Sequence, residues 1–264
     1  MTVDTYFIFA MGRSGGSSLQ HAITAAINKK NPSTGEPFKT GIYHEVLKKS
    51  RYPEKTLLKQ VEFIKRNFCG LKINLHHFSF IPEEKFGRFD DSKQFFRPIF
   101  NSFDHIILNE RKNLLKKVIS ERQAVKLDSW EVNSLEDRVK LIESSKTWTE
   151  DLEAVENHLK RKEDLWNFCT DLLSDSEISV YNADYEDVYV DTTVDERIDK
   201  VKDIVNWLGY AFDDEHTGTI EHLMSPKRKV SSKRLYSLID NIHDINERFG
   251  PKYGYLFEEH NNDN

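Results

Sequence analysis

The residues best suited to chemistry stand near the start of the chain, in the stretch Gly-Arg-Ser-Gly-Gly-Ser-Ser at 12–18. An apolar run of strand character precedes it, and apolar residues at helical spacing follow. Glycines let a turn between a strand and a helix curl, so that backbone N–H groups and the positive end of the helix face an anion. The alternative is an ordinary tight turn whose serines cap the helix. We predict an anion site with Arg13 as the cation, made of Gly12, Arg13, Ser14, Gly15, Gly16, Ser17 and Ser18.

This turn is neither of the two common nucleotide-binding motifs. A Walker A loop needs a Gly-Lys pair followed by Ser or Thr, where the lysine reaches the terminal phosphates and the hydroxyl holds magnesium. No such pair follows Gly12, and the spacing G-x-G-x-x-G is absent as well. A turn without this lysine suits an anion that needs less neutralisation than a nucleoside triphosphate, such as a sulfuryl group. We therefore expect no metal.

A second phosphate-binding pattern lies at 106–120, Ile-Ile-Leu-Asn-Glu-Arg-Lys-Asn-Leu-Leu-Lys-Lys-Val-Ile-Ser. Arg111 follows a predicted strand, and Ser120 lies further along the helix that begins there. Arginine gives a permanently charged, forked grip on a phosphate dianion. A ligand draped over this helix could meet both side chains, although a solvated basic helix face would show the same residues.

These two stretches together resemble sulfotransferases that use 3′-phosphoadenylyl sulfate (PAPS), and the pattern is closest to the bacterial trehalose 2-sulfotransferase-like branch. The first resembles the family's 5′-phosphosulfate loop, and the second resembles its 3′-phosphate site at Arg111 and Ser120. The segments 181–188 and 238–250 resemble the family's "YEDL" segment and C-terminal helix. Gly16 departs from the pattern, because the family usually has a hydroxyl residue there.

The resemblance implies transfer of a sulfuryl group from PAPS to an acceptor hydroxyl, with PAP (the 3′,5′-bisphosphate) as the other product. The acceptor must lose a proton, so a positioned base helps. The sequence "GEPF" resembles the family's "GE-x-F" stretch, which makes Glu36 the first choice of base. His44 and Glu45 remain alternatives. Arg13 is the candidate for stabilising charge on the departing oxygen.

Three further basic features have two interpretations each. Lys72 could be a cation near the sulfate or a surface lysine whose ammonium reaches water. The basic segment 227–234 could close over the 3′-phosphate or be a solvated loop. His76 and His77 are adjacent, but no third ligand stands at useful spacing, so we predict no metal site.

The elements that must position these residues alternate along the chain. Apolar runs predict strands at 6–11, 69–75 and 105–110, and the segment 177–188 is predicted as a fourth strand that ends in a polar turn. Apolar residues at helical spacing predict helices at 17–28, 54–68, 111–127, 148–173, 196–210 and 235–250. This order predicts an α/β fold, a three-layer sandwich with a central parallel sheet flanked by helices, of the P-loop nucleotide-binding type. Ligands of such sheets bind beyond the carboxyl ends of the strands, where the polar stretches fall.

Composition sets the remaining expectations. The length of 264 residues suits a single sulfotransferase-like domain over 1–264, with variable acceptor-site segments around 36–103 and 128–150. The net charge of −6 argues against a nucleic-acid partner. Two distant cysteines, no long apolar stretch and no signal-peptide pattern predict a cytoplasmic protein without membrane contact. The expected partner is a small-molecule or carbohydrate acceptor with a hydroxyl group, and an oligomer is possible.

Two other functions remain open. One is a P-loop phosphotransferase, a kinase acting on a small molecule, which the missing Gly-Lys pair and the Arg111–Ser120 pattern disfavour. The other is a catalytically inactive nucleotide-binding protein of the same fold, which the glycine at position 16 allows.

Overall fold

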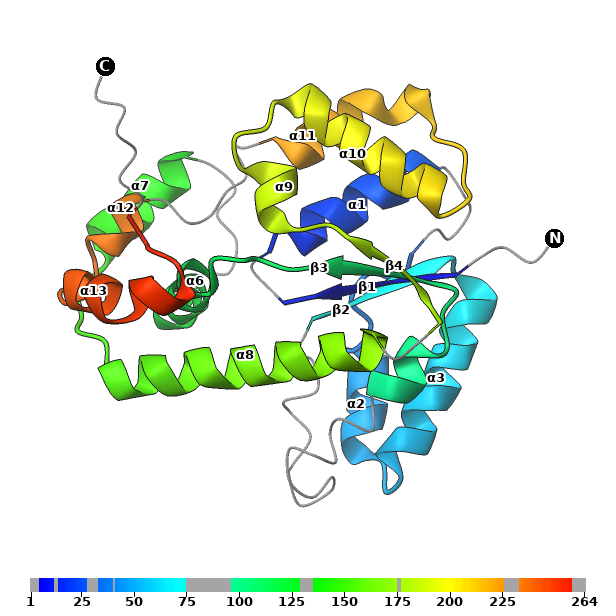
Figure 1. Cartoon of the computed structure of the whole chain (residues 1–264), viewed down its shortest axis with the longest axis horizontal. Coiled ribbons are helices and arrows are strands. Elements are labelled where there is room, and N and C mark those ends of the chain that lie inside the picture. Colours follow the sequence, from blue (N-terminus) through cyan, green and yellow to red (C-terminus); the bar gives the residue numbers. More distant parts are fainter. Residues whose placement is uncertain are drawn as a thin grey trace. The chain divides into compact units, whose positions relative to one another are not determined.

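The computed structural model describes residues 5–11, 14–27, 33–39, 41–74, 96–128, 135–174, 177–225 and 233–257. Within these residues it is an α/β structure with a four-stranded parallel sheet (Figure 1). The predicted α/β class and parallel sheet are therefore confirmed, and the arrangement is compatible with a three-layer sandwich. The chain divides into two compact units, 1–110 with 165–224 and 111–164 with 225–264. The single domain expected from the sequence stays a prediction.

The first unit holds the sheet and the helices that pack on it. Its strands are β1 (Tyr6–Ala10), β2 (Gly70–Asn74), β3 (His105–Asn109) and β4 (Ser179–Asn182). Its helices are α1 (Gly16–Ile27), α2 (Ile42–Lys49), α3 (Pro53–Asn67), α9 (Tyr185–Tyr189), α10 (Val194–Trp207) and α11 (Thr217–Met224), with a 3-10 turn at Asp214–His216. All four strands lie within the segments that are predicted as strands.

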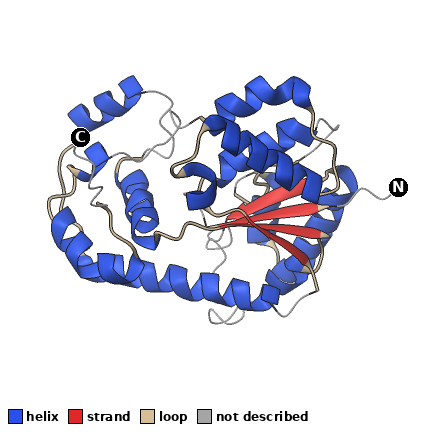
Figure 2. Ribbon diagram, turned by 45° about the horizontal axis from the view of Figure 1, so that its top comes forward, coloured by secondary structure: helices blue, strands red, loops and turns tan. Residues whose placement is uncertain are grey.

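The central strand β1 is covered on both faces, which explains its unbroken apolar sequence. Tyr6 and Ile8 pack into a core with residues of α1, α10 and α11. Phe7 and Phe9 point to the opposite face, because successive side chains of a strand alternate. There the Phe9 ring stacks on Trp166 with the ring centres 5.6 Å apart. Helices α1, α10 and α11 thus lie on one side of the sheet and α3 on the other (Figures 1 and 2).

The strand order β2-β1-β3-β4 indicates the edge of the sheet where a ligand is expected. The chain passes from β1 to one neighbour and later returns to the other, so the connections reverse direction beside β1. Ligands of parallel α/β sheets bind at such a point, outside the carboxyl ends of the strands. In the register, Ala10 at the end of β1 is paired with Asn74 of β2 and with Asn109 of β3. The turn after β1 therefore begins between two asparagines.

The second unit is helical in its described part. It contains α6 (Leu114–Lys126), α7 (Leu135–Ser144), the first part of α8 (Leu152–Ser174), α12 (Lys233–Tyr236) and α13 (Ile242–Tyr253). The remainder of α8, from Leu165, belongs to the first unit. A buried contact joins distant segments: Glu150 accepts from Trp148 Nε1 at 2.9 Å and from Arg122 Nε at 2.6 Å. No helix in the described residues is both long and apolar enough to cross a membrane.

Several differences from the sequence-based expectations concern helices. The structure adds α2, α7 and α11, whose segments are mostly polar or short. It also forms α9 at Tyr185–Tyr189, where the sequence predicts the end of the fourth strand segment. It also divides the helix expected at 235–250 into α12 and α13, since the backbone turns between Tyr236 and Ile242. The end of α10 agrees with the prediction, because Gly209 follows it with a φ of 77°, a conformation that favours glycine.

Candidate anion-binding site

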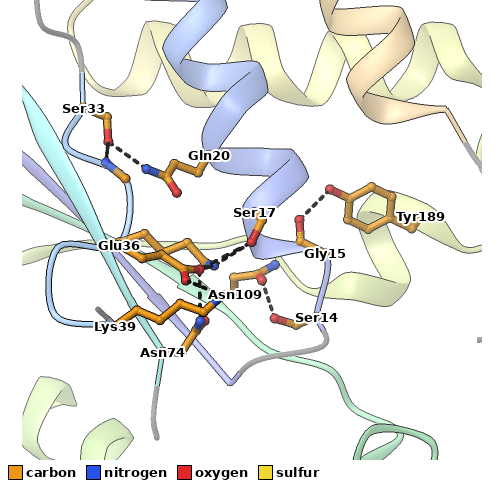
Figure 3. Close-up of polar contacts among 12 residues, drawn as sticks. Ser14, Gly15, Ser17, Gln20, Ser33, Glu36, Lys39, Asn74, Asn109 and Tyr189 are labelled. Carbon is orange, nitrogen blue, oxygen red and sulfur yellow. Dashed lines mark hydrogen bonds and ion pairs between the residues drawn. The ribbon is translucent and has the colours of Figure 1, made fainter. Parts of the chain in front are cut away.

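The described part of the turn after β1 is fixed by the neighbouring strand β3. Ser14 is fully buried, and its hydroxyl donates to Asn109 Oδ1 at 2.5 Å (Figure 3). The Asn109 amide in turn donates to the backbone carbonyl of Ala183 at 2.7 Å. A hydroxyl has only one proton to donate. Ser14 therefore uses its proton inside the protein, and its role in this arrangement is to hold the turn in place.

Gly15 has a conformation and a contact that exclude a side chain. Its φ is +72°, in the left-handed region, and an added Cβ would lie 2.3 Å from the ring of Tyr189. The Tyr189 hydroxyl donates to the Gly15 carbonyl at 3.0 Å (Figure 3). Burial raises the pKa of this phenol, so it stays a neutral donor. Helix α9, which carries Tyr189, thus clamps the turn.

Gly16, where the sequence departs from the sulfotransferase pattern, is also packed without space. An added Cβ would lie 2.8 Å from Asn109 Oδ1 and 3.0 Å from both Ala10 Cβ and Lys72 Cε. Asn109 cannot move easily, because both ends of its amide are hydrogen-bonded. The glycine at this position is therefore required by packing at the start of α1.

We expect Gly16→Ser to destabilise the protein by about 1–3 kcal/mol, the usual range for overpacking, although it would bring the turn closer to the family pattern. Gly218 in α11 is the matched control, because an added Cβ there meets nothing within 4 Å. Gly218→Ser should change stability by less than about 0.5 kcal/mol. Denaturant unfolding of both variants tests this, and an unchanged midpoint for Gly16→Ser would contradict the packing argument.

A carboxylate and a lysine meet beside the first turn of α1. Glu36 Oε1 accepts from Lys72 Nζ and, at 3.1 Å, from Asn74 Nδ2. The Ser17 hydroxyl receives a hydrogen bond from Lys72 Nζ at 2.9 Å. It also lies 3.4 Å from the same carboxylate oxygen of Glu36 (Figure 3). The other oxygen, Oε2, lies 3.5 Å from Nζ of Lys39. The structure therefore brings Ser17 and Glu36, two of the predicted site residues, into one hydrogen-bonded cluster.

Lys72 is a buried residue and not the surface lysine that the sequence also allowed. Its side chain is 2% exposed, whereas that of Glu36 is 15% exposed. Burial lowers the pKa of the Lys72 amine, because the charged form loses water, and the charge and hydrogen bond of Glu36 oppose this shift. Lys72 comes from β2, and its ammonium lies beside the turn at 12–18, which has no lysine of its own.

The two alternative bases lie on α2. The His44 Nδ1 donates to the Phe38 carbonyl at 3.2 Å, and its Nε2 lies 4.0 Å from Glu45 Oε1. Glu45 is half exposed and lies 3.3 Å from Lys49, whose hydrogen bond and charge lower the Glu45 pKa. Within the described residues, the Glu36 carboxylate contacts a residue of the predicted anion site, Ser17.

The predicted 3′-phosphate residues belong to the second unit. Arg111 is 7% exposed, and Ser120 on α6 is 4% exposed. One residue further, Glu121 is surrounded by His158 at 3.2 Å, Lys162 at 3.1 Å and Lys117 at 3.9 Å. Burial acts to raise the Glu121 pKa, but these basic groups outweigh it and lower the pKa below its usual range. The buried Lys117 of α6 and the α8 residues His158 and Lys162 thus surround this carboxylate, and Arg111 precedes α6 in the chain.

Several predicted residues lie outside the part of the chain that the structure describes. They are Gly12, Arg13, His76, His77 and the basic segment 227–232; of Lys233 and Arg234 only the backbone is described. Ser18 is the third residue of α1 and is partly exposed. In the described residues, no group of three or more His, Cys, Asp or Glu side chains is placed to hold a metal ion.

Sequence reasoning missed three residues of the site: Asn74, Asn109 and Tyr189. The two asparagines share a signal, since each is the last residue of a buried strand. A polar side chain at that position of a parallel strand points to the ligand edge of the sheet. Tyr189 has no comparable signal, because its contact with Gly15 joins segments 174 residues apart.

Comparisons with known proteins do not assign this site. No protein-family model matches the chain, and no curated protein matches its sequence.

Proposed function

We propose that this protein is a PAPS-dependent sulfotransferase with a P-loop-type nucleotide-binding fold. The observation that carries the proposal is the cluster of Ser17, Glu36 and Lys72 at the N-terminus of α1. It combines a helix N-terminus and a buried cation, which suit an anion, with a carboxylate at the same place. Transfer of an anionic group to a hydroxyl needs both parts, an anion site and a base.

The proposed reaction is an in-line displacement at sulfur. The acceptor oxygen attacks sulfur, and its proton passes to the Glu36 carboxylate. A new O–S bond forms while the bond from sulfur to the 5′-phosphate oxygen breaks. The electron pair of the broken bond stays on that oxygen, and PAP leaves. Backbone N–H groups at the start of α1, together with Arg13, are the proposed donors that stabilise the departing charge.

The proposed donor is distinguished from other adenine nucleotides by its 3′-phosphate, which we assign to Arg111 and Ser120. A charge-assisted hydrogen bond from arginine contributes about 1.5–3 kcal/mol. PAP should therefore bind at least about tenfold more tightly than AMP. Arg111→Ala should remove most of this preference and leave AMP affinity almost unchanged. Calorimetric titration of PAP and AMP into both proteins measures the two ratios.

The control variant for this titration is Lys126→Ala, which removes an exposed charge from the last turn of α6, the helix that carries Ser120. It should keep the wild-type ratio of PAP to AMP affinity. Equal affinity of the wild-type protein for PAP and AMP would exclude the sulfotransferase. Transfer of labelled sulfate from PAPS to an acceptor would then separate an enzyme from an inactive nucleotide-binding protein.

The phosphotransferase remains the second candidate because of Lys72. The sequence disfavours a kinase since its glycine turn has no lysine, but Lys72 supplies a cation from the adjacent strand. A titration with ATP, done in parallel with those of PAP and AMP, distinguishes the kinase from the sulfotransferase. Tighter binding of ATP than of PAP would favour the kinase. A cytoplasmic location and a small-molecule or carbohydrate acceptor stay predictions.

A further inference from the structure

The ammonium group of Lys72 is placed where it needs an anion. With 2% of its side chain exposed, the group cannot be solvated by bulk water. Among the described residues it donates to two acceptors, Ser17 Oγ and Glu36 Oε1. An ammonium has three N–H donors, so one of them is available for a further acceptor.

Among the described residues, positive charge exceeds negative charge around this group. Ser17, which Lys72 contacts, is the second residue of α1, where the helix dipole is positive. The first turn of α1 contains no acidic residue. Lys39 adds a second ammonium at 3.5 Å from Glu36 Oε2. In the described part of the chain, Glu36 is thus the carboxylate that lies against two lysines and a helix N-terminus.

The same contacts restrain Glu36 as a base. Its Oε1 accepts from Lys72, from Asn74 at 3.1 Å and from Ser17 at 3.4 Å. Donors and a neighbouring positive charge stabilise the ionised carboxylate and make it a weaker proton acceptor. For Glu36 to take the acceptor's proton efficiently, at least Lys72, the buried one of its two charged partners, should leave it.

We propose that Lys72 exchanges partners when the donor binds: it pairs with Glu36 in the free protein and with the donor's 5′-phosphosulfate in the complex. This inference rests on the proposed function. In the free protein, the Glu36 carboxylate pairs with the Lys72 ammonium until an anion replaces it. Binding of the donor then releases the carboxylate, which can accept the proton of the acceptor hydroxyl. Donor binding would in this way precede activation of the base.

The exchange predicts opposite effects of the two partners on anion affinity. Glu36→Gln removes the competing charge but keeps an oxygen of the same shape, so it should bind PAP about three- to tenfold more tightly than the wild type. Lys72→Met should bind PAP at least about tenfold more weakly. In the double variant the gain from Glu36→Gln should disappear, because the lysine that it frees is absent. Calorimetric titration measures all three, and thermal unfolding checks that each is folded.

Lys49→Met is the matched control, since Lys49 is a lysine on α2 that pairs with Glu45 and is 76% exposed. It should change PAP affinity less than about twofold, because an exposed charge is screened by solvent. If Glu36→Gln binds PAP no more tightly than the wild type, the exchange is wrong while the proposed donor stands. The PAP affinity of Glu36→Gln remains a decisive measurement even if Lys72→Met does not fold. Failure of the wild type to bind PAP would instead overturn the proposed function itself.

Discussion

Glu36→Gln is expected to lower sulfuryl transfer by about two to four orders of magnitude, the usual contribution of general acid–base catalysis. The amide cannot take up the acceptor's proton at neutral pH. Its oxygen can still accept hydrogen bonds from Lys72, Asn74 and Ser17, so the cluster should keep its arrangement. Steady-state transfer from PAPS, with thermal unfolding measured in parallel, separates loss of the base from loss of the fold.

The matched control for this prediction is Glu45→Gln. Glu45 is a half-exposed carboxylate on α2 that pairs with Lys49. Its loss should leave turnover within about twofold, because an exposed helix ion pair contributes little. If His44→Ala loses turnover by orders of magnitude while Glu36→Gln does not, the base is His44.

Arg197→Met is expected to destabilise the protein by about 3 kcal/mol or more. Arg197 is 4% exposed, and its guanidinium donates to the carbonyls of Met224 at 2.7 Å, Thr192 at 2.9 Å and Tyr189 at 3.2 Å. Methionine leaves these acceptors buried without the donor, and each unsatisfied group costs about 1–3 kcal/mol. Denaturant unfolding measures the loss.

This effect should also reach the candidate site, because Tyr189 holds the Gly15 carbonyl. Nucleotide affinity should therefore fall in Arg197→Met under conditions where the variant is still folded. Lys202→Met, an exposed change on the same helix, should alter stability by less than about 0.5 kcal/mol. Equal stability of the two variants would show that the buried guanidinium contacts contribute nothing.

The sequence by itself determined the strands, most of the long helices and part of the site. Buried strands need unbroken apolar runs, and β1, β2 and β3 lie within the runs that predict them. The turn at 12–18 and Glu36 stood out because their residue types suit one chemistry. These signals are local, since each depends on residues that are neighbours along the chain. Short polar helices such as α2 and α7 carry no comparable local signal.

The tertiary structure alone decided the role of Lys72 and the reason for Gly16. A lysine in a strand is compatible with a surface position, and only the pairing of β2 with β1 brings its ammonium to the start of α1. Gly16 looked like a departure from a family pattern until Asn109, Ala10 and Lys72 were seen to fill the space beside it. Both features depend on contacts between residues far apart in sequence. Such contacts are fixed by packing of the whole sheet, and no local pattern of residue types encodes them.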